Sequence, residues 1–105
     1  MDYSESIEKT KEFIAAHLSE ELTAEIIAGE AGYSVFHYCR VFKEYTGKCL
    51  MTYVREKRLD AAKEKIKKGI TAAEAAFECG FETPSGFYRA FERKFGERPT
   101  KRMHA

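Results

Sequence analysis

The chain has 105 residues, of which 44% are hydrophobic and 13% aromatic, so it can bury a core without disulfides or a metal and is too apolar to be disordered. No apolar run approaches membrane-spanning length and the N-terminus lacks a signal-peptide pattern, so we expect a cytoplasmic protein with no membrane partner. The three cysteines, an odd number without a close pair, argue against a disulfide framework or a zinc site.

The formal net charge is only +1 at pH 7, but the charged residues are unevenly distributed. Residues 1–34 hold two lysines against eight acidic residues, whereas residues 35–105 hold sixteen Lys and Arg against nine acidic residues. A basic region is typical of proteins that bind nucleic acid. Lysine-rich stretches also form ordinary solvated helix faces, so charge alone does not separate the two interpretations.

The first two elements are predicted to be helices, since the chain has only two prolines and no strand pattern. The first helix covers about residues 4–18. One face of it carries Ile7, Ile14 and Leu18. The second helix follows Thr23, a favourable N-cap residue, and ends at Gly32, because glycine accepts the left-handed conformation common at helix C-termini.

The third helix is expected to end just before Gly47 and the fourth to begin just after it. Ser34 is expected to cap the third helix, about residues 35–45. Its core stripe, at helical spacing, is Tyr38, Phe42 and Tyr45. The fourth covers about residues 50–68 and is roughly 27 Å long at ~1.5 Å per residue. Its expected core residues are Val54, Leu59, Ala62 and Ile66.

The last part of the chain predicts two further helices and a short terminal one. Thr71 and Glu74 have the spacing of a capping box at the start of the fifth helix, which runs to Glu78. Thr83 caps the sixth helix, with Pro84 at its first position. The expected core stripe of the sixth helix is Phe87, Phe91 and Phe95. A short seventh helix is expected to open at Pro99.

An internal repeat relates the second and third helices to the fifth and sixth. The segment AGYSVFHYCRVFKEYTG (31–47) aligns with CGFETPSGFYRAFERKFG (79–96), and the second copy has one extra turn residue. Each copy has the outline of a helix-turn-helix. We therefore expect subdomain one at about residues 4–49, a linker helix at about 50–68 and subdomain two at about 70–105. Two such copies predict two helices that contact one long ligand, for which DNA is the obvious choice.

The predicted core stripes place other side chains on the outer faces of the third and sixth helices. On the third helix these are Phe36, Arg40 and Lys43, with His37 and Cys39 beside them. On the sixth helix they are Ser85, Arg89 and Glu92, with Tyr88 beside them. Arg40 and Arg89 occupy matching places in the two copies, and arginine binds either a guanine edge or a phosphate.

Each of these assignments has a plain structural alternative. Phe36 is also explained as a core residue displaced from the main stripe, and His37 as a surface or capping side chain. Arg40 and Arg89 are also explained as ordinary salt-bridged arginines, and Tyr88 as a cover for apolar surface. Cys79 stands where the first copy has an alanine, so it is expected to be buried. Redox sensing through Cys39 or Cys49 is the less favoured reading of the other two cysteines.

No arrangement of residues points to catalysis. His17, His37 and His104 are scattered, and nucleophile elbow, phosphate loop and HExxH motifs are absent from the sequence. We therefore expect a protein that is not an enzyme and that needs no cofactor.

The stretches FYRAFERKFGERP, AGYSVFHYCRVFKEYTG and YVREKRLDAAKEKI resemble the DNA-binding domain of the AraC/XylS family of bacterial transcription regulators. The resemblance covers about residues 7–101. It implies an all-α fold of seven helices, with two helix-turn-helix subdomains joined by the long fourth helix. It also implies that the third and sixth helices, which we call the reading helices, enter successive major grooves. These grooves recur every ~34 Å on one face of the duplex.

The resemblance also assigns residues to the DNA. The expected base-facing residues are Phe36, Cys39, Arg40, Pro84, Ser85, Tyr88 and Arg89. The expected contacts to the DNA backbone are Ser34, His37, Lys43, Thr83 and Arg93. Pro84 and Ser85 are shorter than the polar side chains common in the family, so the sixth helix is expected to contribute mainly phosphate contacts and Arg89.

The sequence therefore predicts a regulator that binds specific double-stranded DNA as a monomer, with RNA polymerase as a further partner. The alternative is a helical interaction module that binds or sequesters another regulator. Most family members carry an effector-sensing domain. If this protein has one, we expect it to follow residue 105 as a small-molecule-binding domain.

Overall fold

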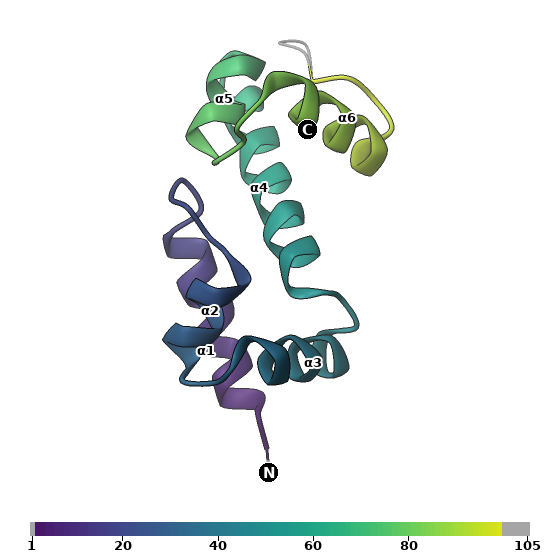
Figure 1. Cartoon of the computed structure of the whole chain (residues 1–105). Coiled ribbons are helices and arrows are strands. Elements are labelled where there is room, and N and C mark those ends of the chain that lie inside the picture. The colour runs from purple at the N-terminus through teal and green to yellow at the C-terminus, as the bar shows by residue number, and fades with distance from the viewer. Residues whose placement is uncertain (1, 100–105) are drawn as a thin grey trace. The chain divides into compact units, whose positions relative to one another are not determined.

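The computed structural model describes residues 2–99, and all regular structure within that range is helical, as predicted (Figure 1). Six helices are present there: α1 (Ser4–Ala16), α2 (Ala24–Ala31), α3 (Val35–Thr46), α4 (Leu50–Lys67), α5 (Ala72–Glu78) and α6 (Pro84–Phe95). Seven helices were expected, and the described residues contain six. The remaining helix, predicted to open at Pro99, lies outside the described residues.

The chain divides into two compact units, residues 1–55 and 56–105, which we call the N-terminal and C-terminal units. Helix α4 crosses this boundary. Its first turns give Leu50 and Val54 to the core of the N-terminal unit. Its later turns give Leu59, Ala62 and Ile66 to the core of the C-terminal unit. Each unit therefore has its own hydrophobic core, and α4 supplies residues to both.

Four helices begin at hydroxyl caps that are local in sequence. The side chains of Thr23, Ser34, Thr71 and Thr83 each accept a hydrogen bond from the backbone N–H three residues further on. These are the predicted N-caps. Because each bond links residues three places apart, it depends only on local sequence. The caps fix where the two helix pairs of the repeat start.

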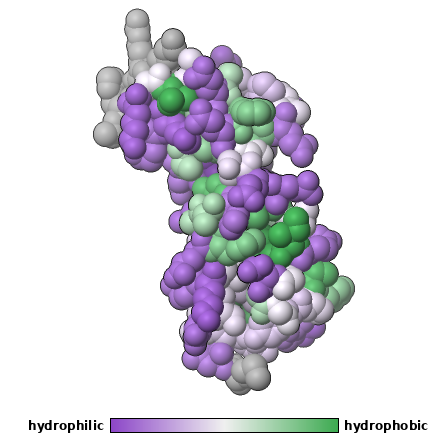
Figure 2. Space-filling model, turned by 90° about the vertical axis from the view of Figure 1, so that its left-hand side faces the viewer, coloured by the Kyte–Doolittle hydropathy of each residue, from purple (hydrophilic) through white to green (hydrophobic). Residues whose placement is uncertain are grey.

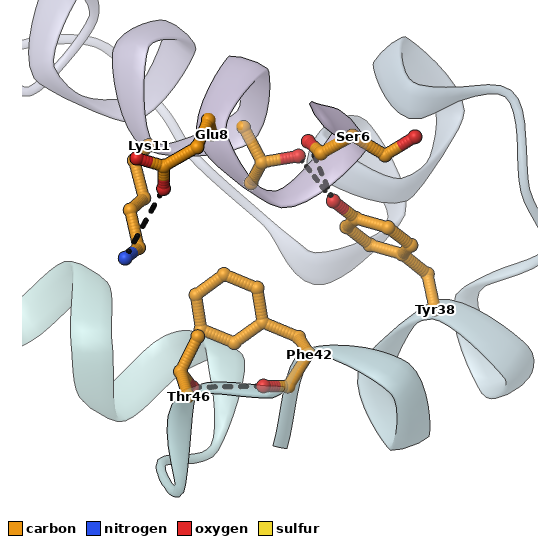
Figure 3. Close-up of polar contacts among 7 residues, drawn as sticks. Ser6, Glu8, Lys11, Tyr38, Phe42 and Thr46 are labelled. Carbon is orange, nitrogen blue, oxygen red and sulfur yellow. Dashed lines mark hydrogen bonds and ion pairs between the residues drawn. The ribbon is translucent and has the colours of Figure 1, made fainter. Parts of the chain in front are cut away.

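In the N-terminal unit, α1 is joined to α3 by a buried hydroxyl pair (Figure 3). The Tyr38 hydroxyl donates to the backbone carbonyl of Ser6 over 3.2 Å and shares a hydrogen bond with the Thr10 hydroxyl. Thr10 is thus part of the buried face of α1, between Ile7 and Ile14. The predicted third member of that face, Leu18, follows the end of the helix and is only half-buried.

The predicted core stripe of α3 is wrong at Tyr45. Tyr38 and Phe42 are fully buried, but Tyr45 is 45% exposed, and Val41 is buried instead. Tyr45 lies in the last turn of α3, where its hydroxyl accepts a hydrogen bond from the backbone N–H of Tyr3 at 3.1 Å. A tyrosine at a helix end can keep its ring at the surface when its hydroxyl has such a partner.

In the C-terminal unit, α6 buries Phe87 and Phe91. The third residue of the predicted stripe, Phe95, is half-buried, and the ammonium group of Lys63 lies 4.2 Å from the centre of its ring. Cys79 is buried as predicted, and this burial raises the pKa of its thiol. A buried neutral thiol behaves as a small hydrophobic side chain.

The described part of the chain contains no helix that is both long enough and apolar enough to cross a membrane. Figure 2 shows one face of the molecule, on which hydrophilic side chains predominate and the apolar ones form small patches.

Candidate nucleic-acid interface

Helix α3 and its N-cap residue present the predicted residues of the first copy. Ser34, Phe36, His37, Arg40 and Lys43 are all exposed. Phe36 is 81% exposed, so it does not belong to the core. The Ser34 side chain accepts the backbone N–H of His37 at 3.3 Å, which places the start of α3 at the expected residue. An exposed phenylalanine at this position is available for apolar contact with a ligand.

Cys39 differs from the other predicted base-facing residues because it is only partly accessible. It packs against the core of the N-terminal unit. Burial, followed by the nearby Glu25 carboxylate, raises the pKa of its thiol. A thiol whose pKa is raised is a poor source of thiolate, so redox sensing through Cys39 is disfavoured.

Helix α6 and its N-cap residue present the predicted residues of the second copy in the same way. Thr83, Pro84, Ser85, Arg89 and Arg93 are exposed. Tyr88 is 41% exposed, and its ring lies 5.7 Å from that of buried Phe87. Tyr88 therefore lies against a buried aromatic ring and still exposes part of its side chain to solvent.

A shallow depression of about 460 Å³ brings three of the predicted base-facing residues together in the C-terminal unit. Its lining consists of Ser85, Tyr88, Arg89, Glu92, Arg98 and Pro99. Arg98 was not predicted as a site residue, although it belongs to the ERP signature that follows α6. Its guanidinium group lies 3.9 Å from the Glu92 carboxylate.

The four α3 and α6 cations that are predicted to contact DNA form no ion pair with a carboxylate in the described part of the chain, whereas Lys94 of α6 lies 3.7 Å from the Asp60 carboxylate. None of the ion pairs formed by residues 2–99 includes Arg40, Lys43, Arg89 or Arg93. The alternative in which Arg40 and Arg89 are ordinary salt-bridged arginines is therefore not seen in this part of the chain. Uncommitted cations can bind an external anion without first breaking an ion pair.

The N-termini of α3 and α6 add to the positive charge of these Arg and Lys side chains. The first turns of α3 and α6 contain no acidic residue, whereas the preceding helix of each copy carries one, Glu25 in α2 and Glu74 in α5. The N-terminus of a helix has a partial positive charge and unpaired N–H groups, which favour anions. An acidic side chain there would offset this preference, and α3 and α6 lack one.

Tyr3 contacts His37, one of the predicted site residues, although no sequence pattern singles Tyr3 out. Its hydroxyl lies 3.1 Å from Nε2 of His37 and shares a hydrogen bond with it. The two residues are 34 positions apart. Local pattern does not report contacts at such a separation, and only the packing of α1 against α3 brings them together.

Within residues 2–99, no group of three or more His, Cys, Asp or Glu side chains is placed to hold a metal ion.

The family model of a helix-turn-helix domain matches residues 27–104, a span that includes both copies of the repeat and α4. The chain belongs to the AraC family of helix-turn-helix transcription regulators. This is a family of DNA-binding transcription regulators, and the chain shares that function.

Two relatives are similar over most of this chain. The probable transcription factor PqrA of Proteus vulgaris is 36% identical over 84 residues, which cover 79% of this chain and 69% of the relative. The right origin-binding protein of Escherichia coli is 31% identical over 102 residues, which cover 94% of this chain. The chain spans only 35% of the length of that second relative.

Solved structures share the fold. A transcriptional regulator from Chromobacterium violaceum described as AraC-type superimposes with a TM-score of 0.86 at 24% identity, over 91% of this chain and 87% of that one. The DNA-binding domain of AdpA, solved in complex with a target DNA, gives a TM-score of 0.84 at 24% identity, over 89% and 85%. At this identity the likeness concerns the fold alone.

Proposed function

We propose that this AraC-family protein binds a specific double-stranded DNA site as a monomer, with α3 and α6 in successive major grooves, and thereby controls transcription. One observation carries the proposal. Arg40 and Arg89 occupy matching places in the two copies of the repeat, and both are exposed and free of ion pairs within residues 2–99. Two equivalent cationic helices in one chain suit a ligand with a repeating anionic backbone.

The proposed contacts divide into two kinds. The base-facing set is Phe36, Cys39, Arg40, Pro84, Ser85, Tyr88 and Arg89. The backbone set is Ser34, His37, Lys43, Thr83 and Arg93. Arginine reads guanine through two hydrogen bonds, and an exposed phenylalanine suits a thymine methyl group. Pro84 and Ser85 are short, so Arg89 carries most of the base recognition proposed for α6.

The proposal includes the organisation of the domain. Subdomain one covers about residues 4–49, the linker helix about 50–68 and subdomain two about 70–105. The names of similar proteins support this mode of action, since one relative is called an origin-binding protein and the AdpA domain was solved with a target DNA. RNA polymerase is the proposed second partner, and the cytoplasm, where bacterial DNA lies, the proposed location. No catalytic step is assigned.

Salt dependence tests the proposal. The preferred duplex is first selected from a random pool, and its dissociation constant is then measured between 50 and 200 mM salt. Because several phosphates are neutralised, the affinity is expected to fall by roughly a thousandfold over this range. A selection that enriches no sequence, together with an affinity that does not depend on salt, would rule out this function.

The alternative function is a helical module that binds another regulator. The observation in its favour is Phe77 in α5, which is 79% exposed and which DNA recognition by α3 and α6 does not use. Such a module would bind a protein partner with weak salt dependence, and Phe77→Ala would reduce that binding. The same substitution is expected to leave DNA affinity unchanged if the main proposal holds.

A further inference from the structure

Tyr3 contacts both ends of α3. Its hydroxyl shares a hydrogen bond with Nε2 of His37, in the first turn, and its backbone N–H donates to the hydroxyl of Tyr45, in the last turn, each over 3.1 Å. Its ring also meets the rings of Tyr33, His37 and Tyr45, with centroid separations of 5.7, 5.8 and 5.9 Å. Tyr3 therefore lies at the centre of an aromatic cluster that flanks the proposed reading helix.

The backbone around Tyr3 is itself held in place. The Asp2 carboxylate accepts hydrogen bonds from the backbone N–H and the hydroxyl of Ser4, at 2.9 and 2.6 Å, and these bonds lower the pKa of Asp2. The carbonyl of Tyr3 accepts the N–H of Ile7 at 2.9 Å, which begins the hydrogen bonding of α1. The position of the Tyr3 side chain is thus set by the start of a helix.

The hydrogen bond between Tyr3 and His37 affects which nitrogen of a neutral His37 ring carries the proton. Only one ring nitrogen carries a proton, and the hydrogen bond made by one nitrogen selects the state of the other. Within residues 2–99, Nδ1 of exposed His37 has no hydrogen-bond partner. A phosphate oxygen can accept a hydrogen bond but cannot donate one. Neutral His37 can therefore bind a phosphate through Nδ1 only when Nδ1 carries the proton. Nε2 must then accept, and the Tyr3 hydroxyl can donate to it.

We propose that Tyr3 is a positioning residue for DNA binding, whose hydroxyl donates to Nε2 of His37 and holds the ring in the tautomer that presents Nδ1–H to a DNA phosphate. The inference rests on the proposed function and specifies one of its backbone contacts. It concerns α3 alone. The residue three places after the cap of α6 is Gly86, where α3 has His37, so the second copy lacks an imidazole at this position.

The test compares Tyr3→Phe with Tyr33→Phe. Tyr33 belongs to the same cluster, with its ring centroid 5.7 Å from that of His37, but its hydroxyl has no hydrogen-bond partner within the described residues. Long-range ¹H–¹⁵N spectra of the free protein at pH 8 report the tautomer of His37. We expect Nδ1–H in the wild type and in Tyr33→Phe, and a mixture of both tautomers in Tyr3→Phe.

The same proteins are then titrated with the selected duplex and with a random duplex. Tyr3→Phe is expected to weaken binding to both by about three- to tenfold, because a phosphate contact carries no sequence information. The dependence of affinity on salt is expected to stay unchanged, because a neutral imidazole releases no counterion. In a His37→Ala background, Tyr3→Phe is expected to have no further effect on binding.

Circular dichroism establishes that each variant is folded before it is compared. An unchanged tautomer in Tyr3→Phe, an affinity equal to that of Tyr33→Phe, or a loss that persists in the His37→Ala background would each overturn the inference. If the wild type binds DNA and Tyr3→Phe binds equally well, this inference alone fails. If the wild type binds no duplex, the proposed function fails and this inference fails with it.

Discussion

Arg40 and Arg89 differ from Lys9, Lys65 and Lys94, each of which lies within 4 Å of a carboxylate. At the scale of single residues, an exposed cation that makes no ion pair retains its full capacity to bind an external anion. Whether such an arginine reads bases or merely contacts phosphates is decided by the sequence dependence of its contribution.

We expect Arg40→Ala and Arg89→Ala each to cost on the order of 1–3 kcal/mol of binding free energy on the selected duplex and little on random DNA. Fluorescence anisotropy titrations measure both quantities. Lys68→Ala is the matched control, since Lys68 is exposed, lies outside α3 and α6, and is absent from the ion pairs of residues 2–99. Equal losses on all duplexes would reassign the two arginines to the phosphate backbone.

At the scale of elements, the start of α6 shows how a local cap constrains its neighbour. The Thr83 hydroxyl accepts the backbone N–H of Gly86 at 3.2 Å. A Cβ atom added at Gly86 would lie 3.0 Å from that same hydroxyl oxygen. A glycine inside a helix usually weakens it. In the structure Gly86 also leaves room for the cap.

Gly86→Ala therefore should not yield the full stabilisation of about 0.5–1 kcal/mol that alanine usually brings to a helix. In a Thr83→Ala background, which loses about 1 kcal/mol with the cap, the same change is expected to give that gain because the crowding is absent. Urea unfolding of the four proteins measures the coupling. A gain of the same size in both backgrounds would show that the glycine is not needed for the cap.

At the scale of the whole molecule, two units with separate cores are connected through one continuous helix. The proposed mode of binding requires both units to engage the same duplex, so the spacing of the two half-sites becomes a measurable property of the protein.

Inserting about 5 base pairs between the half-sites of the selected duplex turns one of them by half a helical turn. We expect the affinity to fall to that of a duplex carrying a single half-site, because only one reading helix can then bind. Gel-shift titrations of the original, the expanded and the single half-site duplexes make the comparison. If the expanded duplex binds as tightly as the original, the two helices do not act together.

The sequence by itself determined the helices of residues 2–99 and most of their outer faces. Four of them begin at caps whose hydrogen bonds link residues three places apart, as at Ser34 and Thr83, and the buried stripes follow the helical period, as at Phe87 and Phe91. Both signals involve residues only three or four places apart, so they can be recognised from the local sequence.

Only the tertiary structure decided which groups from distant elements meet. It left Tyr45 at the surface, paired Thr10 with Tyr38, and placed Tyr3 against His37. These contacts join residues 28 and 34 positions apart, and they depend on how α1 packs against α3. No local pattern records that packing, because the partner of each group lies on another helix.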